Sequence, residues 1–398
     1  MLESTKNENE TEALVPYSKW GIKNFVQAQF RKAGVTINGN SSCDPQIKDD
    51  SFYRKLIFGG ILAFGEMYVD EIWDVEDLCD LIYKMKLAEL DQKGNFHFGS
   101  IFLGIFNRIQ NKQNRVRAWT VGPKHYDLGN DIFEHMLDRR MVYSCAYWER
   151  ASSLDEAQEN KLDLICKKLG LKPGMSVLDI GCGFGSFAKF AAEKYGVKVF
   201  GITVSKEQKT LGEELSKGLP VKIETLDFRD LPKSGEFDRA VSIGMFEHVG
   251  VKNYRVFMET VFHQLKEDGL FLLHTIGMED QTWEQSIDPW TERYIFPNGS
   301  IPCLSRLSRS FEKLMVLEDL HNFGYDYYKT LVSWYSNFNA SWDKIEEKYG
   351  SKFFRMWKYY LLVSAGCFQA RKLQVWQLLL SKNGVPKGYR NRCVNATD

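Results

Sequence analysis

At Val177-Leu178-Asp179-Ile180-Gly181-Cys182-Gly183-Phe184-Gly185, a short apolar run ends in three glycines, and a helical pattern follows over Phe187–Tyr195. Glycines at such a turn let the backbone bend sharply and approach a ligand, because no Cβ stands in the way. A dinucleotide fingerprint would need its third glycine at the position of Ser186. The third glycine is Gly185 instead, so the spacing is GxGxG and a different ligand class is indicated.

Apolar runs of strand length recur after this turn, separated by segments of helix length. They lie at Val197–Thr203, Val221–Thr225, Phe237–Ile243 and Leu270–Thr275. The alternation predicts a parallel sheet covered by helices, which is an α/β fold. Two further candidate strands, Leu314–Leu320 and Leu373–Leu380, flank a long aromatic region of helical character.

The GxGxG spacing, preceded by an acidic residue on the strand, resembles the S-adenosylmethionine loop of Rossmann-like methyltransferases. Many nucleotide sites place a carboxylate after the second strand, where it accepts hydrogen bonds from ribose hydroxyls. That position holds the neutral Thr203 here, with Gln208 a turn later, so these two side chains would do the work. Asp227, after the third strand, is expected to receive the adenine amino group.

The first quarter of the chain has a helical pattern in place of the alternating strands and helices. Residues 1–15 are polar and predict a flexible tail. Apolar side chains recur at helical spacing from Tyr17 to Ala33, and more helices are expected near 50–66 and 76–91, around a turn at Gly59-Gly60. No strand pattern or catalytic constellation appears before about residue 105. We therefore expect a helical domain at 16–105, a linker at 106–120 and a catalytic domain at 121–398.

The first of these helices carries lysines and arginines among its apolar residues. It could insert its apolar face at a membrane surface while the basic residues meet anionic headgroups. It could equally pack against its neighbours, as most amphipathic helices do. Pattern alone favours the second interpretation.

Composition excludes several classes of protein. The chain has 398 residues, with 52 basic and 52 acidic side chains and 44% hydrophobic residues, which excludes a disordered chain and a strongly basic nucleic-acid-binding protein. The eight cysteines form no CxxC and no zinc spacing, so no metal site is expected. The polar N-terminus is not a signal peptide, and no run approaches the length of a membrane span. These features predict a cytoplasmic protein that is soluble or peripherally bound.

Several segments together resemble the cyclopropane-fatty-acyl-phospholipid synthases, to which the mycolic-acid cyclopropane synthases are related. The resemblance runs from about Ala33 to Leu380, and it includes the helical N-terminal domain of the bacterial phospholipid enzymes. The motifs that carry it are Lys124–Asp131, Tyr143–Trp148, Val177–Gly185, Gly244–Gly250, Leu273–Gly277, Tyr294–Gly299 and His321–Gly324.

The resemblance implies a reaction that moves the methyl group of S-adenosylmethionine onto a cis double bond in an acyl chain of a membrane phospholipid. Ring closure to a cyclopropane follows and leaves S-adenosylhomocysteine. It also implies a bound bicarbonate ion as the base. The matching positions offer side chains at Glu247, His274 and Tyr327, and mainly backbone groups at Cys145 and Ile276. A nucleophilic role for Cys145 is disfavoured, because no partner base adjoins it and the reaction needs no covalent intermediate.

The resemblance further implies the cofactor contacts. Besides the loop, they match residues before the first strand and after the later strands: Tyr143, Ser144, Asp179, Gly181, Gly183, Gly185, Thr203, Gln208, Asp227, Phe228 and Ile243. One departure concerns the C-terminal helix, where related enzymes often carry a cysteine. This chain has Ser364 there, with Cys367 three residues later.

The reaction would pass through a carbocation, which calls for a dry pocket lined by aromatic rings. The candidate walls are Phe246, Tyr294, Phe296, Tyr325, Tyr327, Tyr328 and Trp334. As partners the resemblance implies an unsaturated phospholipid, peripheral association with the inner face of the cytoplasmic membrane, a second copy of the chain, and no nucleic acid. We expect the helical N-terminal domain and the basic C-terminal residues Lys382, Lys387, Arg390 and Arg392 to contact lipid.

Three alternatives remain open at this point. The first is a relative that forms methyl-branched or methylene products, because the fate of the cation depends on where the base lies. The second is a small-molecule N- or C-methyltransferase, which would leave the N-terminal helices without a purpose. The third is a non-catalytic lipid-binding protein on the same fold, against which the full set of glycines and site residues argues.

Overall fold

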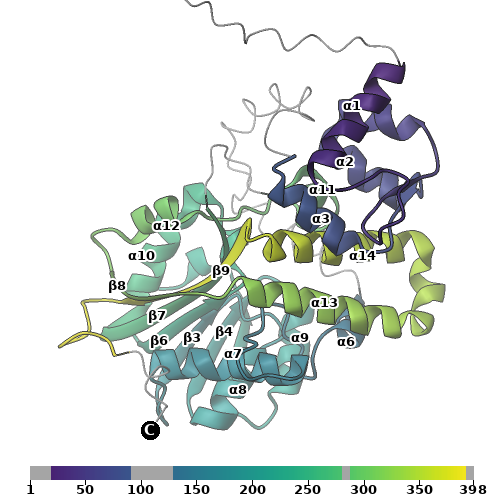
Figure 1. Ribbon diagram of the computed structural model, residues 1–398. Helices are drawn as coiled ribbons and strands as arrows, with labels where there is room; N and C mark the ends of the chain where they lie inside the picture. The colour runs from purple at the N-terminus through teal and green to yellow at the C-terminus, as the bar shows by residue number, and fades with distance from the viewer. Residues whose placement is uncertain (1–18, 91–128, 280–286, 391–398) are drawn as a thin grey trace, which may run out of the picture.

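The turn at Gly181–Gly185 follows an inner strand of a seven-stranded sheet in the computed structural model, which describes residues 19–90, 129–279 and 287–390 (Figure 1). The order across the sheet is β5-β4-β3-β6-β7-β9-β8. The strands are β3 (Ser176–Ile180), β4 (Lys198–Thr203), β5 (Val221–Thr225), β6 (Phe237–Ile243), β7 (Leu265–Met278), β8 (Val316–Asn322) and β9 (Leu373–Ser381). Every predicted strand is therefore confirmed, and β7 is longer than expected.

The sheet is parallel over its first five strands, but β9 pairs antiparallel with both β7 and β8. The reason is the helical hairpin between β8 and β9, formed by α13 (Tyr325–Ala340) and α14 (Glu346–Gln369). The hairpin returns the chain to the sheet edge that β8 has just left, so β9 must run back against its neighbours. The parallel arrangement predicted for the first five strands is confirmed, and the direction of the two further strands, which was not predicted, is antiparallel at β9.

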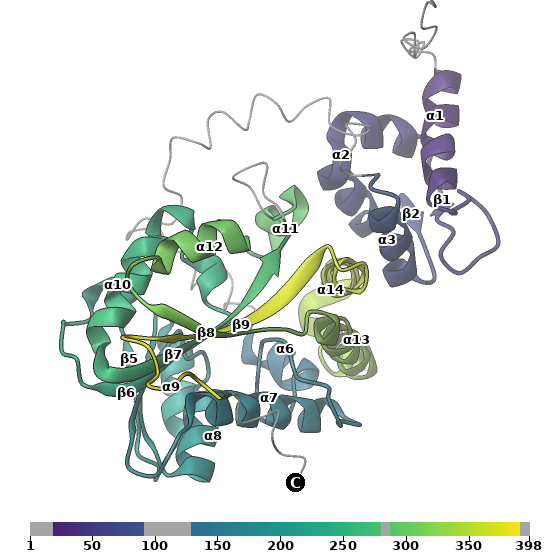
Figure 2. The same ribbon diagram turned by 60° about the vertical axis from the view of Figure 1, so that its left-hand side comes forward.

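Helices cover both faces of the sheet (Figure 2). The remaining helices of this part are α6 (Gly129–Met136), α7 (Leu154–Leu169), α8 (Ser186–Tyr195), α9 (Lys206–Leu215), α10 (Tyr254–Gln264), α11 (Pro289–Tyr294) and α12 (Leu304–Phe311), with short 3-10 turns η1 (Phe228–Asp230), η2 (Phe246–His248), η3 (Val251–Asn253) and η4 (Trp342–Lys344). Because successive strand side chains alternate in direction, Val177 joins the core under α7 and α8, whereas Leu178 joins the core under α10 and α12.

The N-terminal part is helical, as predicted, with α1 (Lys19–Lys32), α2 (Ser51–Val69) and α3 (Leu78–Leu87). It also contains two two-residue strands, β1 (Gln46–Ile47) and β2 (Trp73–Asp74), so the expectation of no strand in this region is wrong. Such short strands leave no alternating pattern in a sequence. The helix α2 bends at Gly60, whose φ of 58° only glycine adopts readily.

The N-terminal helices share one hydrophobic core with the sheet domain. The cluster that contains Phe52 and Tyr68 continues into Trp290 of α11 and Tyr359 of α14. The approach is close: a Cβ at Gly65 of α2 would lie 2.5 Å from Cδ1 of Trp290. The three helices are consequently packed against the catalytic part rather than held apart from it.

This core also decides between the two interpretations of the first helix. Val26 and Phe30 of α1 are completely buried in it. Packing against neighbours is therefore confirmed for the apolar face of α1. The predicted tail, the predicted linker at 106–120, the first five residues of the motif Lys124–Asp131, and Arg392 lie outside the described residues.

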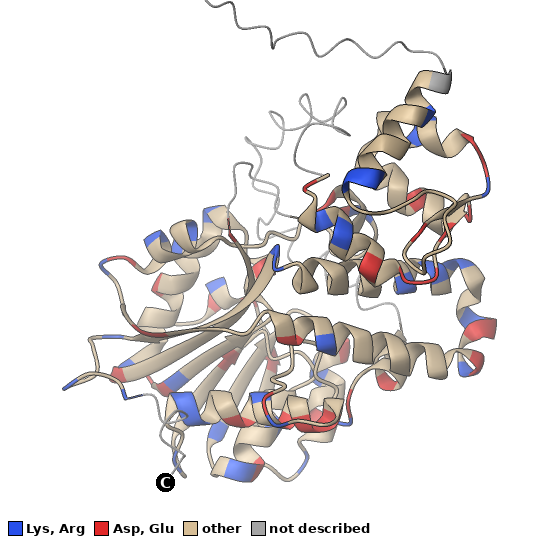
Figure 3. Cartoon of the chain, in the orientation of Figure 1, with Lys and Arg blue, Asp and Glu red and all other residues tan. Residues whose placement is uncertain are grey.

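Charged side chains are spread over both the helical part and the sheet part, with basic and acidic residues interspersed (Figure 3). Many form ion pairs, and Lys382, which follows β9, donates to Glu267 at 2.9 Å. Among the described helices, none is both long and apolar enough to cross a bilayer.

Candidate functional site

A cavity of about 500 Å³ lies where β3, β6 and β7 end, at the carboxyl edge of the sheet. Ligands of open α/β sheets bind at this edge. The glycine turn forms part of its wall, and α7, α13 and α14 contribute other parts. Most of the predicted site residues face this one space: Tyr143, Ser144, Cys145, Asp179, Gly181, Gly183, Gln208, Ile243, Glu247, His274, Ile276 and Tyr327.

The glycine turn adopts backbone angles that disfavour other residues. Gly181, Gly183 and Gly185 have φ of 80°, 56° and 75°. At Gly181 a Cβ would also lie 2.4 Å from Cγ of Met245, whereas a Cβ at Gly183 would meet no protein atom within 4 Å. Gly183 thus leaves open space beside the cavity. Gly185 is the N-cap of α8 and is not part of the wall.

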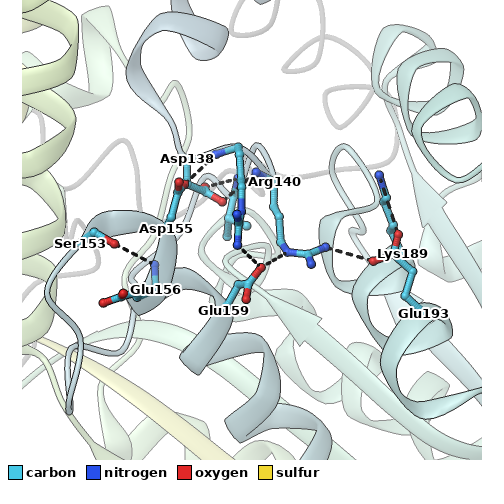
Figure 4. Close-up of polar contacts among 10 residues, drawn as sticks. Asp138, Arg140, Ser153, Asp155, Glu156, Glu159, Lys189 and Glu193 are labelled. Carbon is cyan, nitrogen blue, oxygen red and sulfur yellow. Dashed lines mark hydrogen bonds and ion pairs between the residues drawn. The ribbon is translucent and has the colours of Figure 1, made fainter.

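The segment Tyr143–Cys145 reaches the cavity from a loop that polar contacts hold in place (Figure 4). The Asp138 carboxylate accepts hydrogen bonds from the backbone N–H groups of Arg140 and Val142, both at 2.9 Å. The Arg140 guanidinium then bridges Glu159 of α7 at 2.9 Å and Glu193 of α8 at 3.2 Å. The loop is therefore tied to two helices that pack on the sheet.

The helix α7 also holds the segment Tyr143–Cys145 through hydrogen bonds to Ser144. Gln158 is fully buried, and its Nε2 donates to the backbone oxygen of Ser144 at 2.9 Å. One turn later, Lys161 donates from Nζ to Oγ of Ser144 at 2.9 Å. The position of the Ser144 hydroxyl is thus set by helix α7.

The residues expected at the ribose are close together. Thr203 at the end of β4 donates from Oγ1 to Oε1 of Gln208 at 2.7 Å. Gln208 faces the cavity and Thr203 lies behind it. Thr203 consequently orients the amide of Gln208 and does not itself reach the open space.

Asp227 and Phe228 do not face the cavity. Arg229 folds back over the 3-10 turn η1, and its Nε donates to the Asp227 carboxylate at 2.8 Å. Phe228 packs edge-on against Phe257 in the core. Neither residue lines the cavity, and the Asp227 carboxylate is hydrogen-bonded to the neighbouring arginine; its expected contact with adenine stays a prediction.

Glu247 follows β6 and is buried. Its Oε1 accepts a hydrogen bond from the backbone N–H of Ile276 on β7, at 2.6 Å. Its Oε2 has no hydrogen-bond partner among the described residues. Burial raises the pKa of this carboxyl. The Ile276 N–H is thereby used to hold Glu247, and one carboxyl oxygen stays available for a ligand.

His274 and Tyr327 offer hydrogen-bond donors on the same cavity. Burial lowers the pKa of His274 well below its usual value, so the imidazole is neutral. Its Nδ1 lies 3.4 Å from Nε2 of Gln377, which fits a tautomer that accepts at Nδ1 and carries its hydrogen on Nε2. Burial raises the pKa of Tyr327, so its phenol keeps its proton. His274 and Tyr327 are two neutral donors beside Glu247, whose pKa is raised, and together they suit a small anion.

Cys145 lies on the same wall, completely buried. Burial raises the pKa of its thiol well above the usual value, and Sγ donates to the Ala146 oxygen at 3.2 Å. A protonated thiol is a poor nucleophile. The geometry agrees with the interpretation that Cys145 forms no covalent bond to substrate.

The predicted aromatic walls need correction. Of the seven candidates, only Phe296 and Tyr327 face the cavity. Phe246 and Trp334 are completely buried in the core, and Tyr294 and Tyr325 are exposed. Aromatic rings do surround the space, but most come from other positions: Tyr143, Phe184, Phe187, Phe296, Tyr327, Tyr360 and Phe368. Ser364 and Cys367 of α14 also face it.

Several residues at the cavity were not predicted. His248 follows Glu247 and is half-buried, and desolvation of its ring lowers its pKa to about 4, so it too is neutral. Lys161 was missed although a signal existed: Gln158, Lys161 and Lys168 lie among the buried positions of α7, where an amphipathic helix carries apolar residues. Lys86 and Glu89, at the end of α3, also line the cavity, so the N-terminal helices contribute to the site.

Glu89 forms a salt bridge with Lys372, at 3.3 Å, across the boundary between the N-terminal helices and the start of β9. Both residues line the cavity. Within the described part of the chain, no group of histidine, cysteine and carboxylate side chains is arranged to hold a metal ion.

The residues present fit the two groups that the resemblance implies. The glycine turn, Gln208 and the unpartnered Oδ2 of Asp179 suit S-adenosylmethionine, which has a nucleoside end and a charged amino-acid end. The neutral donors around Glu247 suit bicarbonate, which is small and singly charged.

Comparison with known proteins gives consistent matches. The model of the mycolic acid cyclopropane synthetase family matches residues 113–378. The chain is 44% identical to the cyclopropane-fatty-acyl-phospholipid synthase of Escherichia coli K12 over 379 residues, which cover 95% of this chain and 97% of that protein. It is 32% identical to sphingolipid C9-methyltransferase A of Emericella nidulans over 382 residues, covering 92% and 70% of the two chains.

The chain is also similar to a solved structure of a family member. The mycolic acid cyclopropane synthase CmaA1, complexed with SAH and CTAB, is similar with a TM-score of 0.62 and 31% identity. The similarity covers 66% of this chain and 98% of that one.

Proposed function

Because the chain belongs to the mycolic acid cyclopropane synthetase family, we propose that it forms cyclopropane rings in the unsaturated acyl chains of membrane phospholipids. It is an S-adenosylmethionine-dependent methyltransferase. The methyl group of S-adenosylmethionine would be transferred to the cis double bond, and S-adenosylhomocysteine would leave. Bicarbonate, bound near Glu247, would supply the base.

One observation carries the proposal: the same cavity contains residues suited to the cofactor and, opposite them in kind, residues suited to a small anion. One half is the glycine turn with Gln208 and Asp179, and the other is Glu247 with the neutral donors His274 and Tyr327. An ordinary methyl acceptor with a nucleophilic nitrogen or oxygen needs no anion site. An alkene does need one, because the cation formed after methyl transfer must lose a proton before water reaches it.

The chain's own residues would act as follows. The buried walls exclude water and hold the acyl chain in line with the methyl group, which a weak nucleophile such as an alkene requires. Aromatic rings from Tyr143, Phe296 and Tyr360 stabilise positive charge through their faces. Glu247, His274 and Tyr327 hold the anion: the raised pKa of Glu247 lets it keep a proton to share, so that two negative charges do not repel.

A second candidate within the same chemistry is methyl branching without a ring. The similarity to sphingolipid C9-methyltransferase A supports this candidate function. The two outcomes differ only in which proton the cation loses. Retention of the complete donor set around Glu247 favours the ring, because that set positions a base for the transferred methyl.

The decisive assay uses phospholipid vesicles with a labelled methyl donor. We expect the lipid to gain one CH₂ and to show the proton resonances of a cyclopropane ring. Turnover should fall by at least about tenfold in carbonate-depleted buffer and recover when bicarbonate is added. The same mass gain without ring resonances would contradict the cyclopropane product. Unchanged turnover after depletion would contradict the role of bicarbonate, and binding of the donor without turnover would contradict catalysis.

We also propose that residues 16–105 attach the protein to the inner face of the cytoplasmic membrane. The apolar face of α1 is already buried, so another surface must make the contact. Leu87 is 55% exposed and directly follows Lys86, which lines the cavity. A membrane surface there would let an acyl chain enter without crossing water. Lys382, by contrast, is paired with Glu267 at the opposite edge of the sheet.

Replacing Leu87 with aspartate should weaken binding to vesicles of anionic phospholipid by about tenfold or more, since the membrane would lose an apolar contact and meet a like charge. Vesicle co-sedimentation measures this. The matched control is Val256→Asp on α10, which is 45% exposed and remote from the cavity. Equal weakening in both variants, or none in Leu87→Asp, would contradict the proposed contact.

Finally, we propose a homodimer. Support comes from β8, the outer strand of the sheet, where Val316, Leu317 and Leu320 are exposed and a second copy would cover them. Sedimentation velocity measures the oligomeric state, and a monomer at micromolar concentration would contradict the proposal.

A further inference from the structure

The cavity extends beyond the anion site along strand β7. His274, Ile276 and Met278 lie on the same face of this strand, because successive side chains alternate in direction, and all three line the cavity. At about 3.3 Å per residue, the Cα atoms of His274 and Met278 are roughly 13 Å apart. Methyl transfer and proton removal at the anion site do not use this outer stretch, which leaves room there for the rest of the substrate.

Apolar side chains line the outer stretch. Met278 is paired across the sheet with Leu373 at the start of β9, and both residues line the cavity. The helix α14, which leads into β9, adds Val363 and Phe368 to the wall. Ligand pockets are lined predominantly by such side chains, with a few polar groups that fix orientation. The apolar walls suit a hydrocarbon chain.

The outer stretch ends at charged side chains. Lys372 directly precedes Leu373, so it lies just past the point where β7 ends at Met278. Lys86 of α3 and Glu89, which follows α3, line the cavity together with it. Nζ of Lys372 is 3.3 Å from Oε1 of Glu89, and these two side chains are 30% and 38% exposed. A ligand can therefore reach both signs of charge at this end of the cavity.

The length of the outer stretch matches a distance within a phospholipid. The hydrocarbon of one leaflet is about 15 Å deep, and the headgroup region adds about 5 to 7 Å on each side. A double bond near the middle of an acyl chain therefore lies roughly 12 to 15 Å from the phosphate. A double bond held beside His274 would consequently place the phosphate near Lys86 and Lys372.

We propose that Lys86 and Lys372 bind the phosphodiester of the substrate lipid, and that Glu89 binds an ammonium group in its headgroup. Lysine is a common phosphate ligand, and a carboxylate beside it attracts a positive group and repels a negative one. Phosphatidylethanolamine carries both charges, whereas phosphatidylglycerol carries only the negative one. The inference rests on the function proposed above, because it takes a phospholipid as the methyl acceptor.

The stability of the fold does not account for this cluster. An ion pair as exposed as Glu89 and Lys372 contributes little to stability, because water competes for both charges. Another pair crosses the same boundary outside the cavity: Lys352 of α14 lies 2.7 Å from Asp70, which follows α2. The position of Glu89 and Lys372 on the cavity wall is what distinguishes the two pairs, and it points to a ligand.

The test compares three lipids with the same oleoyl chains, each diluted in micelles of a nonionic detergent. They are phosphatidylethanolamine, phosphatidylglycerol and dioleoylglycerol, which has no phosphate. With a labelled methyl donor, the wild type should show a kcat/KM at least about tenfold higher for phosphatidylethanolamine than for dioleoylglycerol. Lys372→Met and Lys86→Met should each lower this value for phosphatidylethanolamine about tenfold, and should change it for dioleoylglycerol by less than about threefold.

Glu89→Gln tests the ammonium contact separately. The wild type should prefer phosphatidylethanolamine over phosphatidylglycerol by about threefold or more, and Glu89→Gln should abolish that preference, since the glutamine neither attracts the amine nor repels an anion. An unchanged ratio in this variant would overturn the role of Glu89.

The matched control is Lys352→Met, which breaks the other ion pair between α14 and the N-terminal part. It should alter none of the three values by more than about twofold. Equal losses for all three lipids in Lys372→Met would assign this lysine a structural role and overturn the phosphate contact. Equal use of dioleoylglycerol and phosphatidylethanolamine by the wild type would overturn it without any variant.

A failure of the proposed function would be recognised separately. If no lipid gained a methyl group, the proposed function would be contradicted, and binding would still decide the headgroup site. By calorimetry with S-adenosylhomocysteine present, the protein should bind soluble dihexanoyl phosphatidylethanolamine about tenfold more tightly than Lys372→Met does. Equal affinities would overturn the inference, whereas methylation of all three lipids at equal rates would overturn it and leave the proposed reaction standing.

Discussion

Replacing Glu247 with glutamine is expected to lower the turnover of unsaturated phospholipid by about 10²-fold or more, the scale of a lost acid–base group. Glutamine keeps an oxygen for the Ile276 N–H but has no acidic proton to share with an anion. S-adenosylhomocysteine should bind with nearly unchanged affinity, because Glu247 lies in the other half of the cavity. The labelled-methyl assay and calorimetry measure the two quantities.

The same substitution should not destabilise the protein. Burial raises the pKa of Glu247 above its value in the unfolded chain. Its contribution to stability is therefore fully present at acidic pH and is lost as the pH rises through the folded-state pKa. Glutamine has no such titration, so the melting temperature of Glu247→Gln should equal or exceed that of the wild type at neutral pH, with the difference shrinking in acid.

The control is Glu259→Gln on the exposed face of α10, which should change neither activity nor stability measurably. Near-normal turnover in Glu247→Gln would contradict the assigned anion site. A clear loss of melting temperature would show instead that the ionised carboxylate stabilises the fold.

Replacing His274 with alanine is the second substitution with a large expected effect. It removes the Nε2–H donor from the cavity and leaves Nε2 of Gln377 without its acceptor. We again expect turnover to fall by about 10²-fold, with cofactor affinity retained. Because the imidazole is neutral, its pKa being far below the usual value, the residual activity should show no new dependence on pH between 6 and about 8.

The conservative variant His274→Gln tests whether a donor is what matters. Its amide can place an N–H near the same position and should recover part of the activity, which an empty cavity alone would not allow. His263→Ala on α10, remote from the cavity, serves as the control. If His274→Ala and His274→Gln were both as active as the wild type, the donor role of His274 would be excluded.

Sequence reasoning succeeded wherever the information is local. The run Val177–Ile180 with its glycines predicted β3, the turn and α8, and the Rossmann-like methyltransferase fold is confirmed. Periodicity placed the helices of the N-terminal part and every strand of the large sheet. The resemblance also assembled residues distant in the chain, and Glu247, His274 and Tyr327 do face one cavity.

It failed where a side chain's direction depends on distant neighbours. Phe246 and Trp334 are aromatic, as cavity walls would be, but their side chains are buried in the core. Phe184 and Tyr360 line the cavity instead. Asp227 follows the third strand as predicted, but it does not line the cavity, and its carboxylate accepts a hydrogen bond from Arg229. No pattern along the chain distinguishes these cases, because aromatic and charged residues occupy either environment depending on what packs against them.

The sequence by itself therefore determined the order of strands and helices, the glycine turn that leaves room for a ligand, and the family to which the site residues belong. Local spacing is sufficient for these, since backbone conformation follows from side-chain period and from glycine's freedom. Only the tertiary structure decided that α3 lines the cavity and that Glu89, which follows it, meets Lys372 there. Burial and the distance between charges arise from packing of segments far apart in the chain, and these two quantities set the charge that each side chain carries.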